Sequence, residues 1–124
     1  MNRIIKFRAW HLGKMYYPDE LKPKFYMNLD GEIVRSYDDQ VLSNQFELMQ
    51  FTGLTDKNGV LIYEGDMVDN WGEDGQSEIM EVMFNDVGQW MWGDGRGNSL
   101  PLYELDMEET VVIGNIYENP ELLT

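Results

Sequence analysis

The amino-acid sequence predicts a mainly β protein, a small barrel or sandwich with few short helices. Strand-like runs recur about every 8–12 residues, and glycine punctuates the breaks between them. Apolar residues almost nowhere follow the 3.6-residue period of a helix. With 124 residues, one domain, or one small domain with an appended piece, can bury a core without metal or disulfide support.

The first predicted strand lies near the N-terminus, where apolar and basic side chains alternate over residues 5–9. Alternation with a period of two is typical of a half-buried strand, so the basic side chains, Arg8 among them, should face outward. A turn at residues 11–14 and a return strand at 15–17 follow. Pro18 should interrupt this strand because proline donates no hydrogen bond to a sheet.

A hairpin is predicted where the runs 24–29 and 32–37 flank Asp30-Gly31. Such a pair favours a type I′ turn, which needs positive φ at both central residues. Residues 38–44 should form a loop or a short helical turn.

The next run, residues 46–51, is apolar on both of its alternating faces, which predicts a central strand or one covered on each side. A turn at Asp56–Gly59 leads to another strand at 60–63. Gly65 then indicates a bulge or bend, the device by which small barrels turn corners.

The C-terminal half contains four further strand-like runs, the first of which is residues 78–84. Its even-numbered residues are all apolar and should face the core. The other runs cover residues 89–92, 99–105 and 110–117. Asn119 and Pro120 read as the cap and first residue of a terminal helical turn. The side chains expected to be buried are Val82, Phe84, Val112, Ile116 and Leu122.

Five motifs are specific in combination: IKFRAW at 5–10, MYY at 15–17, QFTGLTDKNG at 50–59, IYEGDMV at 62–68 and IGNIYENPELL at 113–123. Together they resemble the YopX family of bacteriophage and prophage proteins. The resemblance implies a phage or prophage origin and an SH3-like barrel in the C-terminal part. We therefore expect a β-rich N-terminal portion over residues 1–45 and an SH3-like barrel domain over 46–124. The resemblance brings no catalytic or binding residue that transfers position by position.

The composition excludes several kinds of chemistry. The chain has no cysteine, so thiol catalysis, cysteine-ligated zinc and disulfides are excluded. Its N-terminal apolar stretch carries charges, unlike a signal peptide, and no apolar run approaches the ~18 residues of a membrane helix. We expect a soluble protein in the cytoplasm of a bacterial host cell.

The net charge is −14, and it is unevenly distributed. Residues 1–27 carry six basic and two acidic side chains, whereas residues 28–124 carry three basic and 21 acidic ones. Such an acidic body repels phosphate, so direct nucleic-acid binding is disfavoured. The acids can form a solvated surface, imitate DNA or receive a basic partner. The basic segment, through Arg3, Lys6 and Arg8, should make an acidic contact within the protomer or across a homo-oligomer.

Candidate catalytic groups are few. His11 is the only histidine, and a lone histidine cannot form a zinc site without further ligands, so we expect an exposed turn residue. Glu64, Asp66 and Asp69 could serve a hydrolase or bind a divalent ion. Their position at a bend also fits a structural role, in which the aspartate accepts backbone N–H bonds. We expect no enzymatic activity, and no catalytic, cofactor-binding or metal-binding residue is assigned.

Aromatic side chains provide the remaining candidate site. Trp90 and Trp92 share one face of a predicted strand, with Trp71, Tyr63 and Tyr103 as possible neighbours. SH3-like barrels often bind peptides through such an aromatic groove. The same rings can instead fill the core of a small barrel. The predicted interaction surface consists of Trp71, Trp90, Trp92 and Tyr63.

Three functional hypotheses remain open. The first is a non-enzymatic phage or prophage accessory protein, with a barrel that mediates protein contacts or self-assembly. The second is an acidic DNA mimic that inhibits a host nucleic-acid enzyme. The third is a small metal-dependent enzyme that uses Glu64, Asp66 and Asp69.

Overall fold

The computed structural model describes residues 4–70 and 77–123 of this mainly β protein, which confirms the predicted class. The chain divides into two compact units, of residues 5–50 and residues 51–124. The boundary falls within strand β6 (Glu47–Thr55), five residues beyond the predicted start of the barrel domain. The helices are short, and the part of the chain that the structure describes contains one α-helix, α1 (Pro18–Leu21).

The N-terminal unit begins with strand β1 (Phe7–His11), which pairs antiparallel with β2 (Lys14–Tyr16) and with the first part of β6. A two-residue turn of Leu12 and Gly13, with φ of +47° and +79°, joins β1 to β2. The predicted turn at residues 11–14 is therefore correct. Both of its central residues have the positive φ of a hairpin turn that matches the strand twist.

The prediction that the Arg8 side chain faces outward is wrong. Arg8 is only 3% exposed, whereas Ile5, which was expected on the buried face, is 60% exposed. The reason lies in the pairing, because β1 lies between β2 and β6 and Arg8 is opposite the buried Met49. Regular strand structure starts only at Phe7. Arg3 lies outside the described residues.

A second sheet of this unit contains β3 (Phe25–Met27), β4 (Ile33–Arg35) and β5 (Gln40–Val41). The predicted hairpin is present, but its turn is longer than two residues. The Gly31 N–H donates to the Asn28 carbonyl, and the Asn28 side chain accepts from Asp30 and Glu32. Gly31 has a φ of +79°, while Asp30 does not have positive φ, so the expected type I′ turn was wrong.

The core of the N-terminal unit consists of Ala9, Leu21, Ile33, Leu42 and Phe46. His11 stacks on Phe46 with ring centroids 4.2 Å apart, and its Nδ1 lies 2.7 Å from the Gln45 carbonyl oxygen. The histidine is half-buried at the end of β1, so the expectation of a simply exposed turn residue was wrong.

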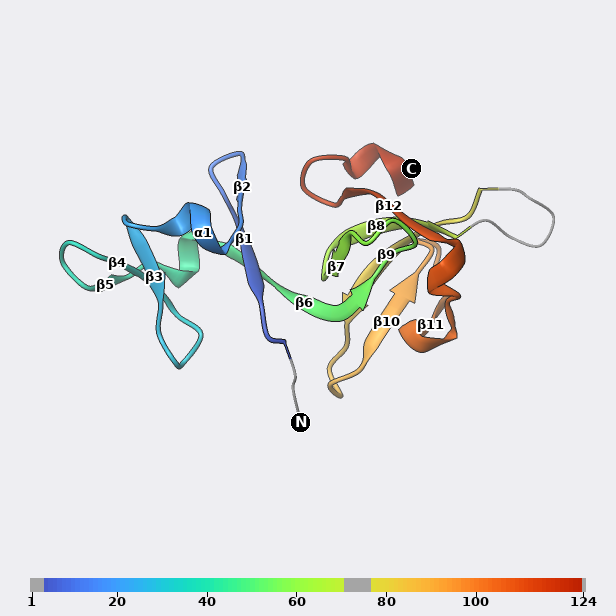
Figure 1. Ribbon diagram of the computed structural model, residues 1–124, viewed down its shortest axis with the longest axis horizontal. Coiled ribbons are helices and arrows are strands. Elements are labelled where there is room, and N and C mark those ends of the chain that lie inside the picture. The colour runs from blue at the N-terminus through green and yellow to red at the C-terminus, as the bar shows by residue number, and fades with distance from the viewer. Residues whose placement is uncertain (1–3, 71–76, 124) are drawn as a thin grey trace. The chain divides into compact units, whose positions relative to one another are not determined.

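The second unit is a curled antiparallel sheet, an SH3-like half-barrel (Figure 1). Its strands run in the order β11-β10-β9-β8-β12, so that β8 to β11 form a meander and β12 returns to pair with β8. Their bounds are β8 (Asp66–Asn70), β9 (Ile79–Phe84), β10 (Trp90–Gly93), β11 (Ser99–Pro101) and β12 (Thr110–Asn115). The short strand β7 (Leu61–Tyr63) pairs with the end of β6. Gly65 forms the predicted bend between β7 and β8, with a φ of +86°.

The barrel core consists of Ile62, Val68, Met80, Val82 and Leu102. Met80 and Val82 face this core as predicted, but Phe84 is 47% exposed. Phe84 is the last residue of β9, where it contacts the Trp90 ring at a centroid distance of 4.8 Å instead of entering the core. Val112, Ile116 and Leu122 are half-buried rather than buried.

Candidate interaction site

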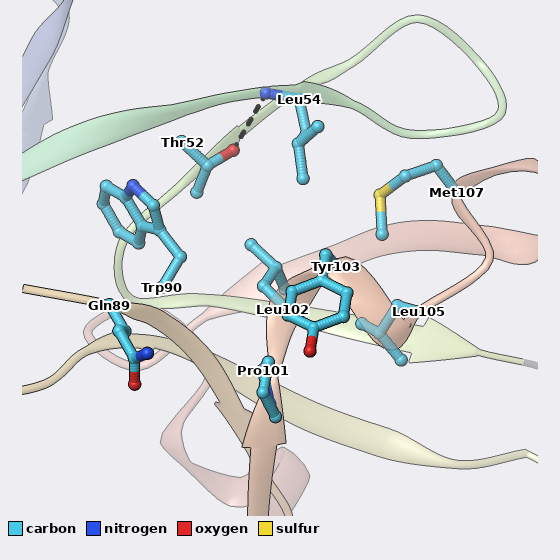
Figure 2. Close-up of a pocket in the computed structure, with 9 residues that line it drawn as sticks. All are labelled: Thr52, Leu54, Gln89, Trp90, Pro101, Leu102, Tyr103, Leu105 and Met107. Atoms are coloured by element: carbon cyan, nitrogen blue, oxygen red, sulfur yellow. Dashed lines mark hydrogen bonds between the residues drawn. The ribbon is translucent and has the colours of Figure 1, made fainter.

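The barrel unit contains an open cavity of about 470 Å³ (Figure 2). Most of its lining is apolar or aromatic. The lining residues are Thr52, Leu54, Gln89, Trp90, Pro101, Leu102, Tyr103, Leu105 and Met107. We call this cavity the barrel pocket. A concave, mostly apolar site with a few polar groups is the usual form of a binding pocket.

Three segments build the barrel pocket. The end of β6 supplies Thr52 and Leu54, and β10 supplies Trp90. Gln89 directly precedes β10, and the other lining residues extend from Pro101, the last residue of β11, through the 3₁₀ turns Leu102–Glu104 and Met107–Glu109. In Figure 2 the Leu54 and Met107 side chains extend toward the cavity from different segments.

Local hydrogen bonds hold the edge of β6 in place. The Thr52 hydroxyl donates to the Ile62 carbonyl over 2.8 Å and accepts from the Leu54 N–H over 3.1 Å. Leu102, 2% exposed, anchors the opposite side in the core, while the neighbouring Tyr103 is 81% exposed. The pocket therefore combines a fixed apolar lining with an aromatic ring open to solvent.

An acidic rim accompanies the apolar lining along residues 102–109. Pocket residues alternate there with exposed carboxylates, which are Glu104, Asp106, Glu108 and Glu109. Asp106 accepts a 3.0 Å hydrogen bond from the Glu108 N–H, and its carbonyl accepts one of 2.7 Å from the Thr110 hydroxyl. These bonds fix the backbone of the rim, in which the exposed carboxylates are close in sequence to the lining residues.

The division into units also divides the charge. Residues 5–50 carry six basic and seven acidic side chains, whereas residues 51–124 carry two basic and 16 acidic ones. Nearly all of the net charge of −14 thus belongs to the barrel unit, and the N-terminal unit is close to neutral. An acidic field of this size attracts cationic partners and repels phosphate.

Three of the four aromatic residues of the predicted interaction surface lie within the described part of the chain. Trp90 lines the barrel pocket, and both Trp90 and Trp92 pack against the barrel core while half-buried. Tyr63 is 3% exposed and its ring lies against Phe51, so it belongs to the interior. Trp71 lies outside the described residues.

The three carboxylates considered for catalysis have separate structural surroundings. Asp66 is buried and accepts a 2.8 Å hydrogen bond from the Tyr63 N–H, as expected for a carboxylate at a bend. Asp69 accepts from the Glu78 N–H over 2.9 Å and from the Ser77 hydroxyl. Among residues 4–70 and 77–123 no group of three or more acidic or histidine side chains could hold a metal ion.

Asp56 and Glu81 are two of the carboxyl groups of the barrel unit whose pKa values are clearly shifted. Burial by itself raises the pKa of Asp56, but hydrogen bonds from the N–H groups of Val112, Val60 and Asn58 outweigh burial and hold the pKa below its usual value. Burial, together with the nearby Glu64 charge, raises the pKa of Glu81. Neither group lines the barrel pocket.

The sequence indicated Trp90 and, as a possible neighbour, Tyr103, but it did not indicate Leu54, Leu105 or Met107. The alternation of apolar and acidic residues in LYELDMEE, residues 102–109, is visible in the sequence. It could have indicated a segment with one apolar side, although strand and 3₁₀ turn are hard to distinguish at this length.

The fold and the pocket define a small two-unit β protein whose half-barrel carries an apolar, acid-rimmed cavity. The chain belongs to the YopX family, which is described as "YopX protein". The model of this family matches residues 6–124. This confirms the resemblance seen in the sequence motifs. No curated protein matches significantly.

Two solved structures are similar over nearly their whole lengths. Protein EF1440 from Enterococcus faecalis is 28% identical with a TM-score of 0.61, over 99% of this chain and 100% of that one. Protein yopX from Bacillus subtilis is 25% identical with a TM-score of 0.65, over 96% and 98% of the two chains. In the described part of this chain no helix is long and apolar enough to span a membrane.

Proposed function

We propose that this protein is a non-enzymatic accessory protein of a phage or prophage that acts by binding other proteins in the cytoplasm of a bacterial host. The barrel pocket is the observation that carries the proposal. Its partner inserts an apolar side chain between Leu54, Trp90 and Met107, while Tyr103 covers the inserted group from the mouth. The similar proteins of known structure come from bacteria, which supports the bacterial setting.

The chemistry of the pocket supports protein binding. Interface anchors are typically aromatic or long apolar side chains that enter a pocket, and tyrosine, tryptophan and methionine are enriched at such sites. The exposed Tyr103 ring and the half-buried Met107 and Trp90 are residues of these kinds. The hydrogen bonds that Asp66 and Asp69 accept from backbone N–H groups favour a structural over a catalytic role for these carboxylates.

A capture experiment tests this function. The tagged protein is used to recover partners from bacterial cells that carry the gene, beside the variants Met107→Asp and Val87→Asp. Val87 is 78% exposed and lies outside the pocket, so it controls for the added charge. We expect recovery of a discrete partner to fall at least tenfold with Met107→Asp and to persist with Val87→Asp. Equal recovery with both variants would contradict the role of the pocket.

A DNA mimic is the second candidate, and the concentration of the net charge in the barrel unit favours it. A mimic binds the basic cleft of a host nucleic-acid enzyme through charge. Its binding should weaken steeply with salt, since screening becomes strong beyond about 8 Å at physiological ionic strength, and duplex DNA should compete. Capture that is sensitive to salt and DNA but indifferent to Met107→Asp would favour the mimic over the pocket.

A further inference from the structure

The N-terminal unit presents an apolar side chain in an unfavourable place. Leu12 is 90% exposed at the tip of the β1–β2 hairpin, with a φ of +47°. Non-glycine residues avoid this left-handed region, and asparagine is the side chain that tolerates it best. A leucine at this position is therefore disfavoured both by its exposure and by its backbone conformation. Such a combination points to a contact that the isolated unit does not make.

Basic side chains surround this leucine. Leu12 lines a surface depression of about 350 Å³ together with Lys14, Lys22 and Lys24. Lys14 forms an exposed ion pair of 3.7 Å with Glu20. Lys22 and Lys24 are exposed, and neither forms an ion pair with the part of the chain that the structure describes.

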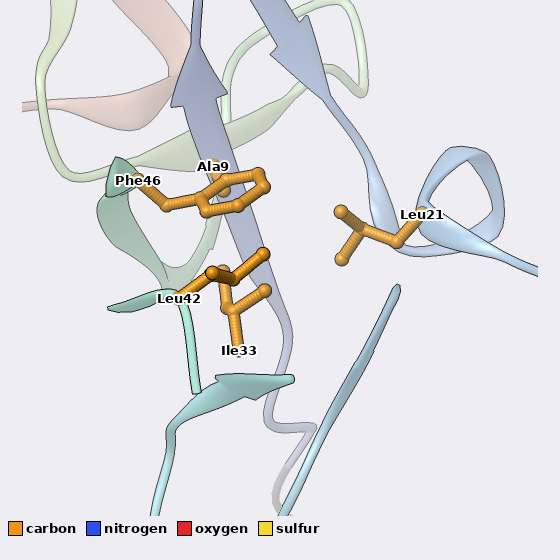
Figure 3. Close-up of a cluster of buried hydrophobic side chains, with 5 residues drawn as sticks. All are labelled: Ala9, Leu21, Ile33, Leu42 and Phe46. Carbon is orange, nitrogen blue, oxygen red and sulfur yellow. The ribbon is translucent and has the colours of Figure 1, made fainter. Parts of the chain in front are cut away.

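The depression rests on a fixed base. Leu21, one of its lining residues, belongs to the core of the N-terminal unit and extends toward the cluster that contains Phe46 and Leu42 (Figure 3). The ring stacking of His11 on Phe46 fixes the end of β1 directly before Leu12. The hairpin tip is therefore a positioned feature of its unit.

The barrel pocket has the complementary features. It is an apolar cavity of about 470 Å³, larger than a leucine side chain, and its rim carries Glu104, Glu108 and Glu109. None of these three carboxylates forms an ion pair within the described residues. The Leu12 tip is an apolar projection beside positive charges, whereas the barrel pocket is an apolar cavity beside negative charges. The two surfaces are therefore complementary.

We infer that the barrel pocket of one copy of this protein receives the Leu12 hairpin tip of a second copy, with Lys22 and Lys24 beside the acidic rim. This inference rests on the proposed role of the barrel pocket as an interaction site. The contact joins two different surfaces, so each copy keeps one free projection and one free pocket. Repetition of such a contact closes into a ring or continues as a filament.

Matched variants of the purified full-length protein test the inference. Leu12→Asn removes the apolar projection and suits the positive φ, so this variant should stay folded. Leu29→Asn is its control, because Leu29 is also fully exposed in a hairpin turn. Tyr103→Lys alters the pocket, and Tyr37→Lys is its control, since these tyrosines are 81% and 80% exposed.

The measurement is the mass in solution by sedimentation. Protein concentrations should extend to the millimolar range, because the dissociation constants of small contacts can be that high. We expect the wild type and both controls to assemble beyond one chain, more weakly at high salt. Leu12→Asn and Tyr103→Lys should each weaken association about tenfold or more, the factor expected for one buried leucine. An equal mixture of these two variants should recover a species of two chains, because one supplies the pocket and the other the leucine.

A wild-type mass of one chain at every concentration would overturn the inference, as would association that both variants leave unchanged. The capture experiment separates this failure from failure of the proposed function. If the wild type stays a single chain while partner capture still depends on Met107, the pocket binds another protein and only the second-copy inference fails. If capture is also independent of Met107, both fail.

Discussion

Asp56 shows how one side chain can close the half-barrel. Its Oδ1 accepts from the N–H groups of Asn58 and Val60 within the turn, and its Oδ2 accepts a 2.9 Å hydrogen bond from Val112 on β12. One buried carboxylate thus shapes the turn after β6 and connects it to a strand 56 residues further along the chain. Three backbone donors thus converge on the aspartate of the motif QFTGLTDKNG.

Asp56→Asn should destabilise the protein by about 1.5–3 kcal/mol at pH 7, since it weakens hydrogen bonds to a charged group. The pKa of Asp56 is lowered on folding, so its contribution is complete above the unfolded pKa of about 3.9 and is lost as pH falls through the folded pKa. Urea unfolding at pH 7 and at pH values below 3.9 measures both effects. An equal difference between variant and wild type at all pH values would contradict this account.

Glu81 makes the opposite prediction. Its pKa is raised by burial and by Glu64, so the folded state disfavours its charged form. Stability should therefore decline as pH rises from the unfolded pKa of about 4.3 through the folded pKa. Glu81→Gln should raise the urea midpoint at pH 7 and leave it unchanged below pH ~4. Glu78→Gln, at an exposed position just before β9, is the control and should have little effect at either pH.

At the scale of elements, strand β9 tests which face of the sheet is buried. Val82 is fully buried in the barrel core, while Phe84, two residues later, is 47% exposed. Val82→Asp should abolish cooperative unfolding, because it removes about 1.5–3 kcal/mol of apolar burial and places a charge in the core. Phe84→Asp should leave a cooperative transition. Circular dichroism during thermal unfolding distinguishes them, and a cooperative Val82→Asp variant would refute the assigned facing.

Strand β12 contains a bulge and is followed by a tight turn. The register against β8 shifts between Val112 and Gly114, and the Asn119 side chain accepts a hydrogen bond from the Asn115 N–H. A Cβ on Gly114 would lie 2.7 Å from the Asn119 Cγ and 3.0 Å from its Cβ. The glycine is thus required because the asparagine side chain occupies the space beside it.

Gly114→Ala should cost about 1–3 kcal/mol by overpacking, measured by urea unfolding. Asn119→Ala should also destabilise the protein, by the loss of its hydrogen bond to Asn115. The double variant separates the two effects. If the clash involves Asn119, its cost should be well below the sum of the single costs, whereas additive costs would contradict this explanation.

Period-two patterns and a glycine turn predicted that β1, β6, β9 and the β3–β4 hairpin are present, because alternation or a turn residue marks each of them in the sequence. The failures occur at strand ends and covered faces. Phe84 follows the apolar alternation but lies where β9 ends, and Arg8 lies on β1 opposite the buried Met49 of the neighbouring strand β6. Burial at such positions depends on which strand lies alongside. That pairing joins distant parts of the chain, so a local sequence pattern does not contain it.

At the scale of the whole molecule, the sequence indicated the SH3-like half-barrel through its family motifs but contained only part of the candidate site. Trp90 was predicted because aromatic residues at strand positions are conspicuous. Leu54, Leu105 and Met107 were not, because ordinary apolar residues become a pocket only when separate segments bring them together. Likewise, the sequence shows an excess of acidic residues. The structure was needed to show that the chain divides into two units and that the excess lies in the barrel unit.

The central claim is that the barrel pocket is where this protein contacts another protein, and photo-crosslinking in living cells tests it most directly. A benzophenone amino acid replaces Tyr103 at the pocket mouth or, as the control, the equally exposed Tyr37 of the N-terminal unit. Irradiation should produce a discrete adduct from position 103 and none of that mass from position 37, and the adduct mass distinguishes a second copy from a different partner. Absence of an adduct at position 103, or the same adduct from both positions, would contradict the claim.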